Sequence, residues 1–146
     1  MFGLEPSSVT RKSDIRDSSD MRWITDEDAV FVLIDGPAWR NAQARGFYEG
    51  GEDDRRDGFL HLSTASQVRG SAARHRAGHP DLWLVAVDPG ALGPALRWEP
   101  ASGSRRPGLF PHLYAALPLG CVRRAIALPL GADGKHVFPA GIPPET

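Results

Sequence analysis

The chain has 146 residues, of which 41% are hydrophobic and 24% charged, and it carries 17 basic against 18 acidic side chains. This size and balance predict one globular domain and argue against an overall basic field for nucleic acid or an anionic membrane. The single cysteine, Cys121, excludes an internal disulfide, and no apolar run approaches the roughly 18 residues of a membrane span, so we expect a cytoplasmic protein.

The first half of the chain predicts a leader, a strand and a helix. Residues 1–22 are polar and aperiodic, which is typical of a flexible leader. The apolar, β-branched run "AVFVLID" over residues 29–35 predicts a buried strand, and a helix follows with Pro37 near its start and Gly46 as its stop. The charged stretch "YEGGEDDRRDG", residues 48–58, is expected to be a loop with solvated side chains.

The next elements are a second helix and a central strand. Ser63 or Thr64 is expected to cap the helix, because Gln67 follows Thr64 by three residues in a capping-box pattern, and the helix runs on to Gly78. The run "DLWLVAVD", residues 81–88, is apolar on both faces and predicts a central strand covered on both sides.

The last third predicts short extended pieces separated by loops. These are "ALRWEP", the flexible basic loop "ASGSRRPG", "LFPHLY" and the final strand "CVRRAIALPL". Strands outnumber helices and several follow one another directly, which favours an α+β fold, a small two-sheet sandwich with two short helices. We expect one domain over residues 23–139 and a proline-rich tail over residues 140–146.

The stretch "DGFLHLST", residues 57–64, places a histidine inside an otherwise ordinary strand. With a period of two, Leu60 and Leu62 share one face, and His61 and Ser63 share the other. One face therefore belongs to a core, and the other presents an imidazole and a hydroxyl. Because histidine titrates near neutral pH, His61 is a candidate acid, base or hydrogen-bonding residue, and we expect it to matter more for binding than for folding.

Two later segments add further candidates. In "RWEP", Glu99 is a carboxylate beside the large aromatic Trp98, in a position where it can act as an acid or stabilise positive charge. In "FPHLY", Phe110, His112 and Tyr114 share one face. We expect these polar faces to meet in one cleft with His61 and Ser63.

Other chemistry is less well supported by the pattern. No HxH, HExxH or paired-cysteine spacing indicates a metal site, and Gly78 separates His75 from His79. Cys121 lies in an apolar strand, where a thiol usually serves as a small hydrophobe. The loop residues Arg105 and Arg106 are able to hold a phosphate or simply to be solvated.

The segments "DGFLHLSTASQV", "DLWLVAVDPGAL", "LRWEP", "LFPHLYAALPL" and "LPLGADGKHVFP" together resemble the small bacterial domain-of-unknown-function 952 family, over about residues 29–139. At the level of fold this family resembles the ADP-ribosyltransferase group, which includes NAD-consuming transferases and tRNA 2′-phosphotransferases. Fold alone does not determine function.

The resemblance implies roles for particular residues. Ser63 and Thr64 match the strand-to-helix segment that holds the nicotinamide ribose in those enzymes, and Glu99 takes the place of their catalytic glutamate. In this chain the first strand offers Val32 and Leu33 where the transferases supply a histidine or arginine. That departure counts against ordinary NAD binding.

Three hypotheses for the function follow. The first is an enzyme that uses NAD or another ribose phosphate as its substrate, with His61 and Glu99 as catalytic residues. Its ligand-binding residues would be Ser63, Thr64, Trp98, Phe110, His112 and Tyr114. The second is a non-catalytic domain that binds a small nucleotide-like ligand or a protein in the same cleft. The third makes the histidines and Tyr114 an internal hydrogen-bond network. No metal, nucleic acid or membrane partner is expected, and the oligomeric state stays open.

Overall fold

A computed structural model describes residues 29–101 and 105–144, so the expected leader over residues 1–22 lies outside the described residues. The helices are α2 (Gly36–Arg45), α3 (Glu52–Asp57), α4 (Val68–His75) and α5 (Pro89–Leu92), with short 3₁₀ turns at Gly93–Ala95 and Leu119–Cys121. The strands are β1 (Val30–Asp35), β2 (Phe47–Tyr48), β3 (Leu60–His61), β4 (Ser63–Thr64), β5 (Leu82–Val87), β6 (Leu96–Pro100), β7 (Leu109–Leu113), β8 (Leu117–Pro118) and β9 (Val122–Leu128).

The described strands form three antiparallel sheets. The main sheet has the order β4-β1-β5-β9, a second has the order β3-β7-β6, and β2 pairs with β8. The α+β class expected from the sequence is confirmed, and β5 is a central strand as its two apolar faces predict. The finer comparison with ADP-ribosyltransferases stays a prediction.

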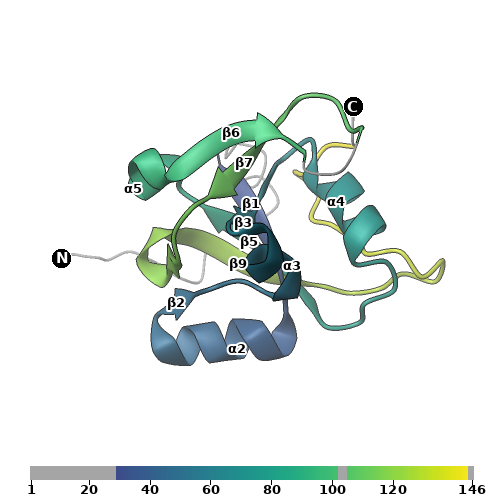
Figure 1. Cartoon of the computed structure of the whole chain (residues 1–146). Helices are drawn as coiled ribbons and strands as arrows, with labels where there is room; N and C mark the ends of the chain where they lie inside the picture. Colours follow the sequence, from purple (N-terminus) through teal and green to yellow (C-terminus); the bar gives the residue numbers. More distant parts are fainter. Residues whose placement is uncertain (1–28, 102–104, 145–146) are drawn as a thin grey trace.

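Two apolar clusters cover the two faces of the main sheet. On one face, Val30 and Val85 pack with Trp39 of α2 and Leu113 of the β3-β7-β6 sheet. On the other face, Phe31 packs in a second cluster that includes residues of α4 and the C-terminal segment. Figure 1 shows α2 and α4 on different sides of the molecule, which agrees with this division. The alternation of apolar residues in β1 and β5 is what produces two cores.

The termini of both expected helices follow from backbone chemistry. Helix α2 ends at Gly46, which adopts a left-handed conformation with φ 91° and donates its N–H to the carbonyl of Ala42, as a helix stop requires. Helix α4 begins at Val68 and not directly after Thr64, because Thr64 is still paired in β4. Gln67 keeps half of the capping-box contact, since its Oε1 accepts the N–H of Thr64.

The largest error of the sequence interpretation is the stretch over residues 48–58. It was expected to be a solvated loop, but residues 52–57 form α3, and Asp54 is only 8% exposed. The fold also holds a third small sheet and the short helix α5 in addition to the expected elements. Ile142, from the segment expected as a tail, is buried in the second apolar cluster. No described helix combines the length and the apolar character needed to cross a membrane.

Candidate functional site

The segment Leu60–Thr64 passes from one sheet to the other. Its first two residues form β3 and pair with β7, whereas its last two form β4 and pair with β1. Leu62 lies at the crossing, where its N–H donates to the carbonyl of Pro111 at 3.0 Å, and its side chain is buried beside Leu60. His61 and Ser63 therefore point away from that core, as the period of two predicts.

His61 and Ser63 line a pocket of about 380 Å³. Phe110 and His112 of β7 belong to its wall, and so do polar residues of α3, α4 and the loop before β7. These polar residues include Asp54, Asp57, Ser71, Arg76 and Arg106. Pockets of this volume fall near the lower end of the range found for small-molecule sites.

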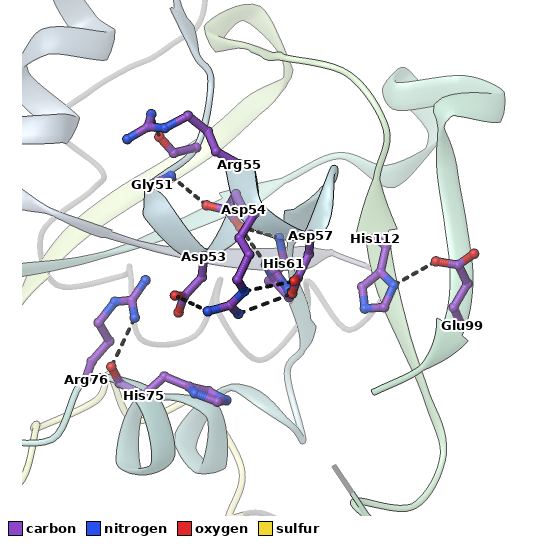
Figure 2. Close-up of polar contacts among 12 residues, drawn as sticks. Gly51, Asp53, Asp54, Arg55, Asp57, His61, His75, Arg76, Glu99 and His112 are labelled. Atoms are coloured by element: carbon purple, nitrogen blue, oxygen red, sulfur yellow. Dashed lines mark hydrogen bonds and ion pairs between the residues drawn. The ribbon is translucent and has the colours of Figure 1, made fainter. Parts of the chain in front are cut away.

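His61 is held between two carboxylates of α3. Its Nδ1 lies 2.6 Å from Asp54 Oδ1, and its Nε2 lies 2.8 Å from Asp57 Oδ2. Asp54 also accepts the backbone N–H of His61 and, through Oδ2, the N–H of Gly51. Figure 2 shows His61 beneath α3 with both carboxylates directed at its ring. Because both ring nitrogens face carboxylates, the imidazolium form fits this place best.

The electrostatics agree with this geometry. Burial alone lowers the pKa of His61, but the hydrogen bonds and negative charges of Asp54 and Asp57 outweigh it and raise the pKa above its ordinary value. Burial likewise raises the pKa of Asp54, but the hydrogen bonds from His61 and Gly51 outweigh it and hold the pKa below its usual range. His61 therefore ties α3 to the strand as an ion pair.

The stability of the protein is expected to depend on pH through this pair. A raised pKa means that the contribution of His61 is fully present below its unfolded pKa of about 6.5 and is lost as pH rises through the folded pKa. Asp54 acts at the acid end, where its contribution is present above about pH 3.8 and is lost as pH falls through its lowered folded pKa.

Urea unfolding of the wild type and of His61→Gln between pH 5 and 9 tests this expectation. Below about pH 6.5 we expect the wild type to be more stable by about 1 kcal/mol, a small value because the imidazole is partly exposed. The difference should shrink towards pH 9. A difference that stays constant over this range would show that the imidazolium is not what stabilises α3.

A second histidine, His112, is paired with Glu99 on the neighbouring strand. The imidazole of His112 is 3% exposed, and its Nδ1 lies 2.8 Å from Glu99 Oε1. The hydroxyl of Tyr114 donates to the same oxygen at 2.8 Å. The hydrogen bonds from His112 and Tyr114 lower the pKa of Glu99, so the carboxylate is ionised at neutral pH. Figure 2 shows the other ring nitrogen of His112 pointing away from Glu99.

The two histidines are neighbours across the β3 and β7 strands. His61 and His112 are directly opposed in the strand register, and their ring centroids lie 5.8 Å apart. The ring of Phe59 stacks on His112 with a centroid distance of 4.1 Å and also contacts His61 and Tyr114. An aromatic residue between α3 and β3 thus fixes the orientation of both imidazoles.

The structure places the sequence-predicted site residues in three groups. His61, Ser63, Phe110 and His112 line the pocket, and Glu99 and Tyr114 lie behind His112. The N–H of Thr64 donates to Gln67 Oε1 and its hydroxyl contacts Ser66 Oγ, so both groups are hydrogen-bonded in the turn before α4. Trp98 is 47% exposed and lies on the face of β6 opposite to Glu99, because neighbouring strand residues alternate. Neither Thr64 nor Trp98 lines the pocket.

Several residues of the site were missed by the sequence interpretation. Asp54 and Asp57 were assigned to a solvated loop, and Ser71 was not singled out. A signal was present, because glycines at positions 51 and 58 flank a six-residue charged helix whose C-cap Gly58 has φ 85°. Gly50 is also required, since a Cβ there would lie 2.6 Å from Leu60 Cδ2. The absence of a side chain at Gly50 thus lets the segment before α3 approach Leu60 of β3 closely.

The remaining candidates lie apart from this pocket or do not form a metal site. Within the described ranges no cluster of histidine, cysteine and acidic side chains is arranged to hold a metal ion. Cys121 is half-buried, and its closest described polar contact is a weak one to the carbonyl of Ala91 at 3.9 Å. His75 contributes to the pocket wall, whereas His79 does not.

Comparisons with known proteins give a family without an activity. The profile of a family described as "Protein of unknown function (DUF952)" matches residues 33–125. A crystal structure of protein CC0527 from Caulobacter crescentus is 38% identical, covers 75% of this chain and 93% of its own, and gives a TM-score of 0.69. The solution NMR structure of CC0527 is 38% identical in sequence. The match covers 73% of this chain and 90% of CC0527, with a TM-score of 0.64. No curated protein matches.

Proposed function

The chain belongs to the DUF952 family of proteins of unknown function, and we propose that it is an enzyme acting on a small phosphorylated riboside, such as a nucleotide or NAD. The observation that carries the proposal is the pairing of Glu99 with His112 at the wall of the pocket (Figure 2). A buried imidazole with one nitrogen fixed by a carboxylate is a common arrangement for a general base.

The hydrogen bond to Glu99 determines which nitrogen of His112 reacts. When Nδ1–H donates to a carboxylate, Nε2 keeps its lone pair. In the proposed reaction Nε2 takes a proton from water or a hydroxyl group. The oxygen then bonds to the anomeric carbon, and the leaving group departs with the electrons of the broken bond. Glu99 stabilises the imidazolium that forms, and Tyr114 holds Glu99 in place.

The size and chemistry of the pocket support this class of ligand. About 380 Å³ suits a mononucleotide, a sugar phosphate or one nucleotide half of NAD. Part of the pocket wall is formed by the ring of Phe110 and the guanidinium of Arg106. The guanidinium carbon lies 4.6 Å from the ring centroid. The guanidinium groups of Arg76 and Arg106 also belong to the wall, and their positive charge favours an anionic group. The resemblance to ADP-ribosyltransferases points to the same class.

His61 has a different role in this proposal from His112. As an imidazolium it donates one N–H to Asp54 and the other to Asp57, so neither ring nitrogen has a lone pair to accept a proton. His61 thus contributes the position of α3. The catalytic role suggested for it by the sequence stays a prediction.

The alternative is a non-catalytic domain that binds the same kind of ligand. Two observations favour it: His61 is fully engaged, and β1 contributes the apolar residues Val32 and Leu33 to the pocket wall. A binding domain needs the pocket but not the lone pair of His112. The two functions therefore share a ligand and differ in the effect of changing His112.

A thermal-shift screen tests whether the pocket binds this class of ligand. We expect ribose 5-phosphate, AMP or NAD to raise the melting temperature, whereas ribose without phosphate raises it much less. A ligand at 100 times its Kd stabilises the folded state by about 2.7 kcal/mol. The matched control is Trp98→Ala, which lies outside the pocket and should keep the shift. If no phosphorylated riboside stabilises the wild type, the proposed function is wrong.

A further inference from the structure

One wall of the pocket holds a chain of hydrogen bonds from a guanidinium to two buried serines. Arg106 Nη1 donates to Ser71 Oγ at 3.1 Å, and Arg106 Nη2 donates to the carbonyl of Gln67 at 3.2 Å. Ser71 Oγ lies 2.8 Å from Ser63 Oγ. Ser63 and Ser71 are 5% and 9% exposed, so both hydroxyls are shielded from bulk water.

The guanidinium of Arg106 fixes the direction of the first hydrogen bond in this chain. A guanidinium only donates, so Ser71 Oγ accepts from Arg106. The carbonyl of Gln67 already accepts from the N–H of Ser71 at 3.0 Å and from Arg106, which uses both of its lone pairs. Either hydroxyl can donate in the contact between Ser71 and Ser63. When Ser71, which already accepts from Arg106, donates to Ser63 Oγ, the proton of Ser63 is left to point into the pocket that Ser63 lines.

We propose that Arg106 and Ser71 are positioning residues that make Ser63 a hydrogen-bond donor to the phosphate of the ligand. This inference rests on the proposed function and deepens it by placing the phosphate. A phosphate oxygen accepts hydrogen bonds and carries the negative charge that the nearby guanidinium favours. The carboxylates of Asp54 and Asp57 are paired with His61, so they compete little with a phosphate for the guanidinium of Arg106.

Calorimetric titration with ribose 5-phosphate tests the inference in four proteins: wild type, Ser63→Ala, Ser71→Ala and the double variant. We expect Ser63→Ala to raise Kd about 10-fold, and Ser71→Ala to raise it about 3-fold. The double variant should bind no more weakly than Ser63→Ala, because Ser71 acts only through Ser63. Ser66→Ala is the matched control, since Ser66 contacts Thr64 and does not line the pocket.

A merely structural role of Ser71 gives a different pattern. If the losses of the two single variants multiply in the double variant, or if Ser71→Ala leaves Kd unchanged, the inference is overturned while binding in the pocket stands. If the wild type binds none of ribose 5-phosphate, AMP and NAD, the proposed function and the inference both fail; if it binds only AMP or NAD, the four proteins are compared with that ligand. Should Ser71→Ala not fold, Arg106→Lys replaces it, because lysine keeps the charge but not the forked geometry. The increase in Kd caused by Arg106→Lys should also disappear when Ser63 is already alanine.

Discussion

His112→Gln is expected to bind a phosphorylated riboside about as well as the wild type and to consume it at least 100-fold more slowly. General acid–base groups contribute about 100- to 10,000-fold to the rate, and glutamine has no group that takes up a proton. The measurement follows loss of AMP and NAD by phosphorus NMR, because both carry a base as leaving group on the anomeric carbon, whereas ribose 5-phosphate does not and serves as the ligand for binding alone.

Glu99→Gln is the companion variant in this experiment. Glutamine keeps the size of the side chain but loses the charge that stabilises the imidazolium form of His112. We expect a loss of turnover in the same direction, with binding retained. If the wild type binds AMP or NAD but consumes neither, the binding-domain alternative replaces the enzyme.

The second large effect concerns folding, where Leu62→Ala is expected to lower the free energy of unfolding by about 2 to 5 kcal/mol. Leu62 is buried in the first apolar cluster at the crossing between two sheets, so the variant leaves a cavity that the sheets cannot readily close. His61→Ala should cost less, because solvent reaches the vacated space from the pocket.

The structure reduces the difference expected between the losses of unfolding free energy in Leu62→Ala and His61→Ala. Without the imidazole, Asp54 keeps the backbone N–H groups of Gly51 and His61 but loses its charged partner in a buried place. We therefore expect His61→Ala to cost about 1 to 2 kcal/mol. Urea unfolding of both variants at pH 6 measures the two values. Equal losses would mean that His61 is a structural residue and that the functional interpretation of its strand fails.

The parts of the fold that sequence predicts best are those whose apolar pattern is strong. The strands β1 and β5 are largely apolar runs that include β-branched residues, and α2 is bounded by Pro37 and Gly46, so burial and backbone preference agree. The expectation that the polar faces carrying His61 and His112 lie near one another also came from alternation, which is a local property. Which strands pair, and in which register, is a long-range property that one sequence does not specify.

Helix α3 shows why the other parts of the fold and site were not predicted from the sequence. Its six residues are all charged, so it has no apolar face, and a helix this short is not stable by itself. It forms because Asp54 and Asp57 hydrogen-bond to His61, which lies seven residues after Asp54 and four after Asp57. Arg106 was similarly ambiguous, since its contact with Ser71 spans 35 positions. Contacts of this kind depend on the folded chain and leave no periodic signal.

A crystal structure of the protein with ribose 5-phosphate tests most directly whether a phosphorylated riboside binds in the pocket beside His112. We expect the phosphate to contact Ser63 and a ligand hydroxyl or a water to lie within hydrogen-bond distance of His112 Nε2. A ligand bound elsewhere on the molecule, or none in a pocket left open at saturating concentration, would contradict this expectation.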